Sequence, residues 1–74
     1  MITEEIYVQR DHWQPRIQLM EFENGGRTVR FCAYVKRGKN YAFSRMPLIL
    51  SESEITELRK KLAGTRQLKK LVRL

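Results

Sequence analysis

The 74-residue chain has little of the chemistry that metal centres and disulfides require: it contains one cysteine, Cys32, and one histidine, His12. A single cysteine excludes an intrachain disulfide and is typical of proteins from reducing, intracellular compartments. Metal sites usually take three or four ligands from His, Cys and carboxylate side chains, and this chain cannot supply the common sets. We therefore expect no metal and no cofactor.

The chain also lacks the sequence marks of a membrane protein. No apolar run approaches the roughly 18 residues of a membrane-spanning helix, and the acidic start "MITEE" is unlike a signal peptide. We expect a soluble, cytoplasmic protein.

The usual signs of catalysis are missing as well. The glycines occur in "GG", "RGK" and "AGT", none of which has the spacing of a phosphate-binding loop. A thiol–imidazole pair of Cys32 and His12 would have no third group to orient it, and a buried thiol is the more ordinary interpretation of Cys32. The sequence therefore predicts that the protein is not an enzyme.

Positive charge is abundant and unevenly placed. Fifteen Lys and Arg against eight Asp and Glu give a net charge of +7. Residues 1–5 carry −2, residues 6–50 carry +5, residues 51–64 balance, and residues 65–74 add +4. Excess cations within the predicted strands and at the end of the chain favour a polyanionic partner.

Two turn motifs divide the first fifty residues into strands. "ENGG" (Glu23–Gly26) is typical of a tight hairpin turn, and "RGKN" (Arg37–Asn40) also contains residues that tolerate unusual backbone angles. Pro15 lacks a backbone N–H, so the strand before the first turn is expected to begin after it. The four expected strands are Ile6–Gln9, Arg16–Phe22, Val29–Lys36, and one from Tyr41 that is interrupted near Met46-Pro47.

A helix is predicted after the strands. Ser51 and Glu54 form a capping box, and Gly64 can end the helix. Residues 65–74 fit either a short second helix, with Thr65 as a cap, or a basic tail. The fold expected is α+β: one domain over residues 1–74, with a curved four-stranded antiparallel sheet (6–50) followed by a helical region (51–74).

So short a chain buries only about 60% of the surface that its unfolded form exposes. Its last third is rich in leucine: Leu58, Leu62, Leu68 and Leu71 exceed what one thin sheet is expected to cover. We therefore predict a homodimer.

The stretch "RTVRFCAYVKRGKNYAFSR" (27–45) alternates between two kinds of face. Val29, Phe31, Ala33 and Val35 fall on one side of a strand, so Phe31 is predicted to pack under the helix. The other side mixes cations with aromatic rings, which suits a single-stranded nucleic acid because its bases expose their faces. The candidate binding residues are Trp13, Arg16, Arg30, Tyr34, Lys36, Arg37, Lys39, Tyr41, Phe43 and Arg45.

The junction between the last strand and the helix resembles a known family. Its pattern, aliphatic-x-Leu, Ser or Thr, two residues, Glu, apolar, two residues, Leu, is matched by Leu48, Leu50, Ser51, Glu54, Ile55 and Leu58. With "VRFCAYV" and "KRGKN" before it, the region 16–62 resembles the transcriptional positive cofactor four family of single-stranded DNA-binding proteins. The chain departs from that family at Met46-Pro47, where a Lys-Gly pair is usual, and at Cys32, where Arg is frequent.

The resemblance implies a curved four-stranded sheet, a homodimer joined through its helices, and single strands held on the sheets. Residues and resemblance together predict a protein that binds single-stranded DNA, or RNA, with little sequence preference. The alternative is a small protein-interaction subunit whose leucine-bearing helix docks on an acidic partner. Tyr34 and Tyr41 discriminate the two: an open basic face favours nucleic acid, and a place beneath the helix favours the adapter.

Overall fold

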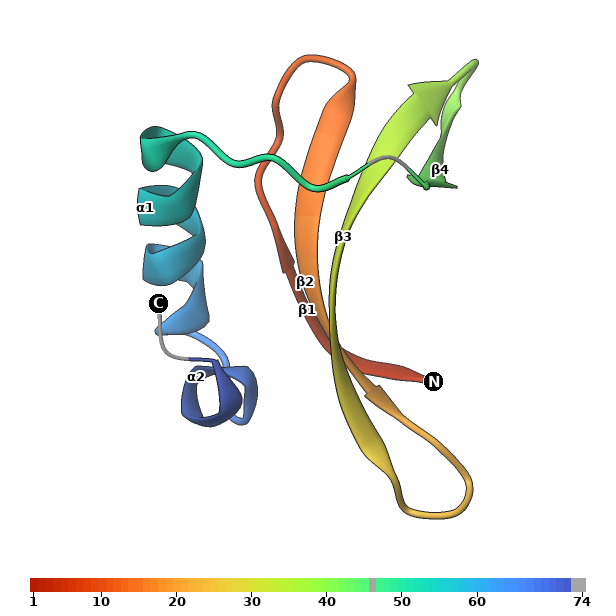
Figure 1. The fold of residues 1–74 in the computed structure, drawn as a ribbon, viewed down its shortest axis with the longest axis vertical. Coiled ribbons are helices and arrows are strands. Elements are labelled where there is room, and N and C mark those ends of the chain that lie inside the picture. Colours follow the sequence, from red (N-terminus) through yellow and green to blue (C-terminus); the bar gives the residue numbers. More distant parts are fainter. Residues whose placement is uncertain (46, 73–74) are drawn as a thin grey trace.

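A computed structural model describes residues 1–45 and 47–72. A four-stranded antiparallel sheet in the order β1-β2-β3-β4 is followed by two helices that lie on one side of it (Figure 1). This arrangement confirms the predicted α+β class and the predicted order of sheet before helix. The elements are β1 (Ile2–Tyr7), β2 (Trp13–Glu21), β3 (Arg27–Arg37), β4 (Asn40–Ser44), α1 (Glu52–Leu62) and α2 (Leu68–Leu71).

Short turns join all four strands, so each strand pairs with its neighbour in sequence. Both predicted hairpins form: Gly25 and Gly38 have φ angles of 85° and 62°, which a residue without a Cβ adopts easily. The turn between β1 and β2 was not predicted. There Arg10 and Trp13 exchange two backbone hydrogen bonds of 2.8 Å around Asp11, whose φ is 52°.

The boundaries of the first two strands differ from the prediction. β1 begins four residues before the expected Ile6, in a segment with little apolar alternation, because pairing with β2 provides its order. β2 runs through Pro15 instead of starting after it. The Pro15 carbonyl accepts a bond from the Val8 N–H (3.1 Å), and the missing proline N–H falls just beyond the last β1–β2 pair, Tyr7 with Arg16.

The predicted capping box of α1 is present. The Ser51 hydroxyl accepts from the Glu54 N–H (3.3 Å), and Glu54 Oε1 accepts from the Ser51 N–H (2.9 Å). α2 is a single turn whose N-cap residue, Gln67, makes no side-chain cap bond, but the Thr65 hydroxyl accepts from the Lys69 N–H (3.1 Å), as expected of the predicted cap. The N-terminal N–H groups of α2 also bond to the Glu4 carboxylate: Gln67 N lies 3.0 and 3.1 Å from the two oxygens, and Leu68 N lies 2.9 Å from Oε1.

The core lies between the helices and the β1–β2 pair. Its buried members are Ile6, Val8, Ile17, Leu19, Leu58, Leu62, Leu68 and Val72. Neither helix in the described ranges is long and apolar enough to cross a membrane.

Phe31 corrects the prediction that it packs under the helix. It pairs with Ile17 and therefore lies on the helix side of the sheet, as its parity indicates. Its side chain is nevertheless 49% exposed, because α1 contacts β1 and leaves this part of β3 uncovered. The alternation of residues predicted the correct face for Phe31, but it could not predict whether a helix would cover that part of the sheet.

The leucines that motivated a dimer are mostly used within one chain. Leu58, Leu62 and Leu68 are buried in the core, and Leu71 is half-exposed. Dimerisation stays a prediction, for which light scattering should give about twice the chain mass of 8.9 kDa. The expected strand interruption at Met46 lies outside the described residues.

Candidate nucleic-acid interface

The sheet face turned away from the helices carries rings, amides and cations in alternate positions. Its cross-strand pairs include Gln18 with Arg30, Gln14 with Tyr34, and Tyr34 with Phe43. We call this surface the open face, and it consists of Glu5, Tyr7, Gln14, Arg16, Gln18, Arg30, Cys32, Tyr34, Lys36, Tyr41 and Phe43.

Arg16 lies at the centre of the β1–β2 part of the open face. Its guanidinium carbon is 3.9 Å from the centroid of the Tyr34 ring and 5.2 Å from that of Tyr7. Its Nη1 is 3.1 Å from the Glu5 carboxylate. Arg16 therefore has its charge balanced within the protein, and it covers one face of the Tyr34 ring.

Gln18 connects the strands beneath these side chains. It is 0% exposed, and its Oε1 accepts from Arg30 Nε (2.7 Å) and from the Cys32 thiol (3.5 Å). Its amide nitrogen donates to Glu5 and to the Tyr34 hydroxyl (3.3 Å). A fully bonded amide at this depth holds the side chains above it in fixed positions.

Cys32 is part of this buried layer. Burial raises the pKa of its thiol, although the charge of Arg30 and its hydrogen bond act in the opposite direction. The thiol form is therefore favoured, in accord with the interpretation of Cys32 as a small buried side chain.

Phe43 is the most accessible ring of the open face. It is 48% exposed and meets Tyr34 edge to face, with ring centroids 5.9 Å apart and an interplanar angle of 86°. The Arg30 guanidinium carbon lies 4.8 Å from the Phe43 centroid. A half-exposed ring beside an oriented cation can take a base on its free surface while the cation meets a phosphate.

The hairpin that carries Phe43 has cations but no carboxylates. From Asn24 to Ser51 the chain contains six Lys and Arg and no Asp or Glu. Lys36 and Lys39 are exposed, and among the described residues no carboxylate lies within ion-pair distance of either. Their positive potential is therefore available to an external anion.

The structure brings six of the ten predicted binding residues together on the open face: Arg16, Arg30, Tyr34, Lys36, Tyr41 and Phe43. Tyr41 is half-buried, and its hydroxyl accepts from Gln9 Nε2 (2.8 Å). Lys39 lies in the β3–β4 turn, with Arg37 at the end of β3, and Arg45 is exposed just after β4.

Trp13 is separated from this group. It pairs with Val35 on the helix side, where the two residues line a cavity of about 540 Å³ with Pro47 and Ile49. Its ring therefore cannot continue the stacking surface of Phe43.

Sequence reasoning missed Glu5, Tyr7, Gln14 and Gln18. A signal for the two glutamines exists, since Gln14, Arg16 and Gln18 alternate along β2 and so share one face. Glu5 carried no such signal, because it precedes the predicted start of the first strand at Ile6. Tyr7 lay within that predicted strand, but its pairing with Arg16 was not predicted.

Comparison with models of known protein families, with curated proteins and with solved structures finds no match to this chain.

Proposed function

We propose that the protein binds single-stranded nucleic acid, DNA or RNA, on the open face with little sequence preference and without catalysing a reaction. The observation that carries the proposal is Phe43, a half-exposed ring with the Arg30 guanidinium against it, on a hairpin that has no carboxylate. Single strands expose the faces of their bases, whereas a regular duplex hides them.

Binding divides between two sets of side chains. The cations of the hairpin region attract the phosphates, and they are Arg30, Lys36, Arg37, Lys39 and Arg45. A base stacks on Phe43 next to Tyr41. Arg16 and Tyr34 have a supporting part, because the Arg16 guanidinium covers the Tyr34 ring and is itself paired with Glu5. We therefore expect the base to stack on Phe43 and not on Tyr34.

The orientation of the tyrosines supports nucleic acid over the adapter alternative. The Tyr34 ring contacts Arg16 and Phe43 on the face opposite the core, and Tyr41 pairs with Lys36 on the same face. The leucines of α1 that an adapter would offer, Leu58 and Leu62, are buried against this chain's own sheet.

A titration at two salt concentrations tests the proposal. With four to six cations engaged, the log–log slope for a labelled single strand should be about −3 to −4, so fourfold more salt weakens binding by roughly 50- to 300-fold. Duplex DNA should bind more weakly at each salt concentration, and a parallel series with RNA compares the two sugars. Equal affinity for duplex and single strand would contradict the stacking mechanism.

The chain offers a matched pair of variants for the face. Phe43 and Phe31 are 48% and 49% exposed on opposite sides of one sheet, so Phe43→Ala and Phe31→Ala remove the same group. Phe43→Ala should weaken single-strand binding by about 5- to 150-fold, the value of one stacked base, while Phe31→Ala leaves it unchanged. A larger loss in Phe31→Ala would place the interface on the helix side.

A further inference from the structure

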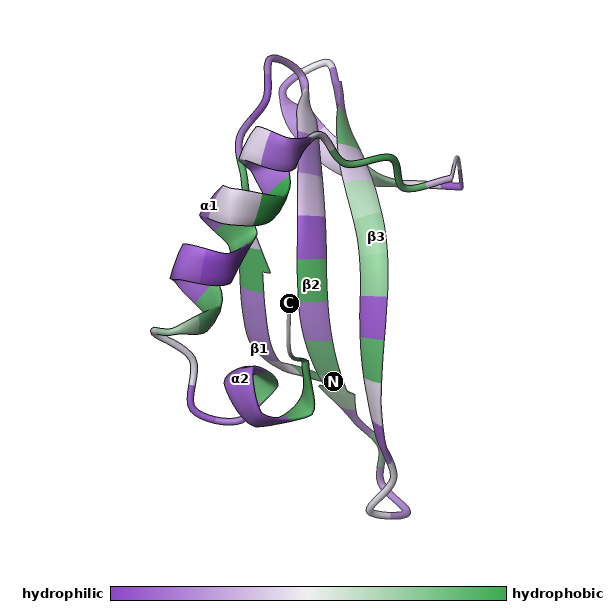
Figure 2. Cartoon of the chain, turned by 60° about the vertical axis from the view of Figure 1, so that its left-hand side comes forward, coloured by the Kyte–Doolittle hydropathy of each residue, from purple (hydrophilic) through white to green (hydrophobic). Residues whose placement is uncertain are grey.

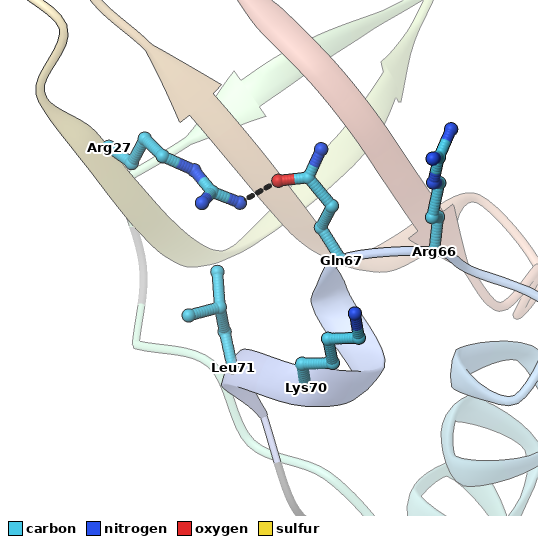
Figure 3. A pocket seen from close by; sticks show the side chains of 5 residues that line it. All are labelled: Arg27, Arg66, Gln67, Lys70 and Leu71. Carbon is cyan, nitrogen blue, oxygen red and sulfur yellow. Dashed lines mark hydrogen bonds between the residues drawn. The ribbon is translucent and has the colours of Figure 1, made fainter.

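A second basic site lies on the helix side, where the start of β3 meets α2. Arg27, Arg66, Gln67, Lys70 and Leu71 line a cavity of about 490 Å³ (Figure 3). Three of the five residues are cations, and no carboxylate lines the cavity. The open face is on the other side of the sheet, so the two basic surfaces are separate.

Hydrogen bonds of both the backbone and the side chain of Gln67 fix its position in the cavity wall. Its backbone N–H donates to the Glu4 carboxylate at 3.0 and 3.1 Å, which ties the residue to β1. Its side-chain oxygen accepts a hydrogen bond from the Arg27 guanidinium, as Figure 3 shows. The oxygen is therefore used within the protein, which leaves the side-chain N–H donors for an external acceptor.

The cations of the cavity have few carboxylate partners. Arg27 Nε lies 3.7 Å from a Glu21 oxygen, an exposed and long ion pair. In the described part of the chain, Arg66 and Lys70 have no carboxylate within 4.0 Å. Three positive charges outnumber the two neighbouring carboxylates, Glu21 and Glu4, so the site keeps a net positive charge that favours an anion.

We propose that this cavity binds a phosphoryl group. The Arg66 guanidinium offers planar pairs of N–H donors that match phosphate oxygens, and Lys70, the remaining Arg27 donors and the Gln67 amide add further donors. Two sources supply the same chemistry: a free oligophosphate, or a backbone phosphate of a strand that passes this side of the sheet. The site stands on its own geometry and does not depend on the open face.

Titration of inorganic pyrophosphate into the labelled 74-residue chain, followed by backbone amide chemical shifts, tests the site. Shifts at Arg27, Gln67 and Leu71 should saturate. Arg66→Gln/Lys70→Gln should weaken binding by at least about tenfold, since it removes two charged donors. The matched control is Arg59→Gln/Lys60→Gln, the same change of charge on exposed residues of α1, and it should stay within about twofold of the unaltered protein.

Two results would overturn the proposal: shifts that do not saturate, or an equal loss in the control pair. Thermal melts of both double variants check that the fold is kept. These results are independent of the Phe43→Ala test, which can fail without affecting pyrophosphate binding.

Labelled oligothymidylate distinguishes the two phosphate sources. If the phosphate belongs to a strand, Arg66→Gln/Lys70→Gln should reduce the salt slope by about 1.4 relative to the control pair, about 0.7 for each lost contact. If pyrophosphate binding is lost while the slope is unchanged, the ligand is a free oligophosphate.

Discussion

The β1–β2 pair and the β3–β4 hairpin belong to one sheet but differ in cover and in charge. The helices lie in front of β1 and β2, with β3 to one side (Figure 2). Ile6, Ile17 and Leu19 are buried there, whereas Phe31 of β3 is half-exposed.

The β1–β2 pair and the β3–β4 hairpin also differ in net charge. Residues 2–21 contain four carboxylates and two arginines, a net −2, while residues 27–44 contain five cations and no carboxylate, a net +5. Since β1–β2 and the helices form the core, the hairpin contributes less to burial and can carry a density of like charge that a core-forming segment would not tolerate.

Leu58→Ala should have the largest effect, because Leu58 lies in the core between the helices and the β1–β2 pair. Leu58 is 1% exposed in the core, and its truncation should lower the free energy of unfolding by about 2–5 kcal/mol. Phe31→Ala, on the uncovered side of β3, should cost less than about 1 kcal/mol. Urea unfolding of both variants measures the difference, and equal losses would mean that β3 is covered after all.

Glu4→Ala tests how α2 is attached to the covered half. The carboxylate accepts from the N–H groups of Gln67 and Leu68, so its removal should cost about 1–2 kcal/mol of stability. Glu57→Ala, an exposed glutamate of α1, is the control and should be nearly neutral. Thermal unfolding provides the comparison, and similar shifts in the two variants would show that the cap contributes nothing.

The Glu54 carboxyl, at the start of α1, makes the stability of the protein depend on pH. Burial acts to raise the pKa of the Glu54 carboxyl, but the hydrogen bonds with Ser51 and the charge of Arg10 outweigh it and hold the pKa below its ordinary value. The native state therefore favours the carboxylate, and its contribution is present above the unfolded pKa and lost as the pH falls through the folded pKa.

Glu54→Gln should consequently cost about 1 kcal/mol at neutral pH and progressively less below about pH 4. Urea unfolding across this range measures it. A cost that stays constant down to low pH would contradict a role for the charge.

Lys39→Gln should have the smallest effect, and it tests whether the charge of the β3–β4 hairpin contacts phosphate. If Lys39 meets a phosphate, the salt slope for single strands should fall by about 0.7, with little change in stability. Lys60→Gln, on α1, removes the same charge from the covered half and should leave the slope unaltered. Equal changes in slope would indicate a diffuse response to net charge.

Local chemistry explains which parts of the fold were predictable. The glycine-containing turns at 23–26 and 37–40 and the Ser51–Glu54 capping box act within a few residues, so the sequence displays them directly. Pro15 misled because the cost of its missing N–H depends on where the neighbouring strand ends. The exposure of Phe31 depends on where the helix lies across the sheet, which a period of two does not encode.

For the candidate site, too, the sequence predicted which residues share a face of a strand but not which side chains contact one another. Parity placed Arg30 and Tyr34 on one face of β3, and Tyr41 and Phe43 on one face of β4, but it left Phe43 open between core and ligand. Only the register between the two strands puts Phe43 beside Tyr34. Parity could not indicate that Arg16 would cover the Tyr34 ring or that Trp13 would face the helix side, because these depend on register and on a strand boundary that was predicted wrongly.

The bonds from Glu4 to Gln67 and Leu68 span 63 and 64 positions of the 74-residue chain. Each pair of neighbouring strands, by contrast, closes over a short turn, so the hairpins can form as soon as they are synthesised. On the ribosome, the apolar side of β1 and β2 would remain without cover until both helices have emerged, because Leu58 and Leu62 of α1 and Leu68 of α2 complete the core. The interval between hairpin formation and helix docking is therefore the stage at which the folding chain is most exposed to aggregation.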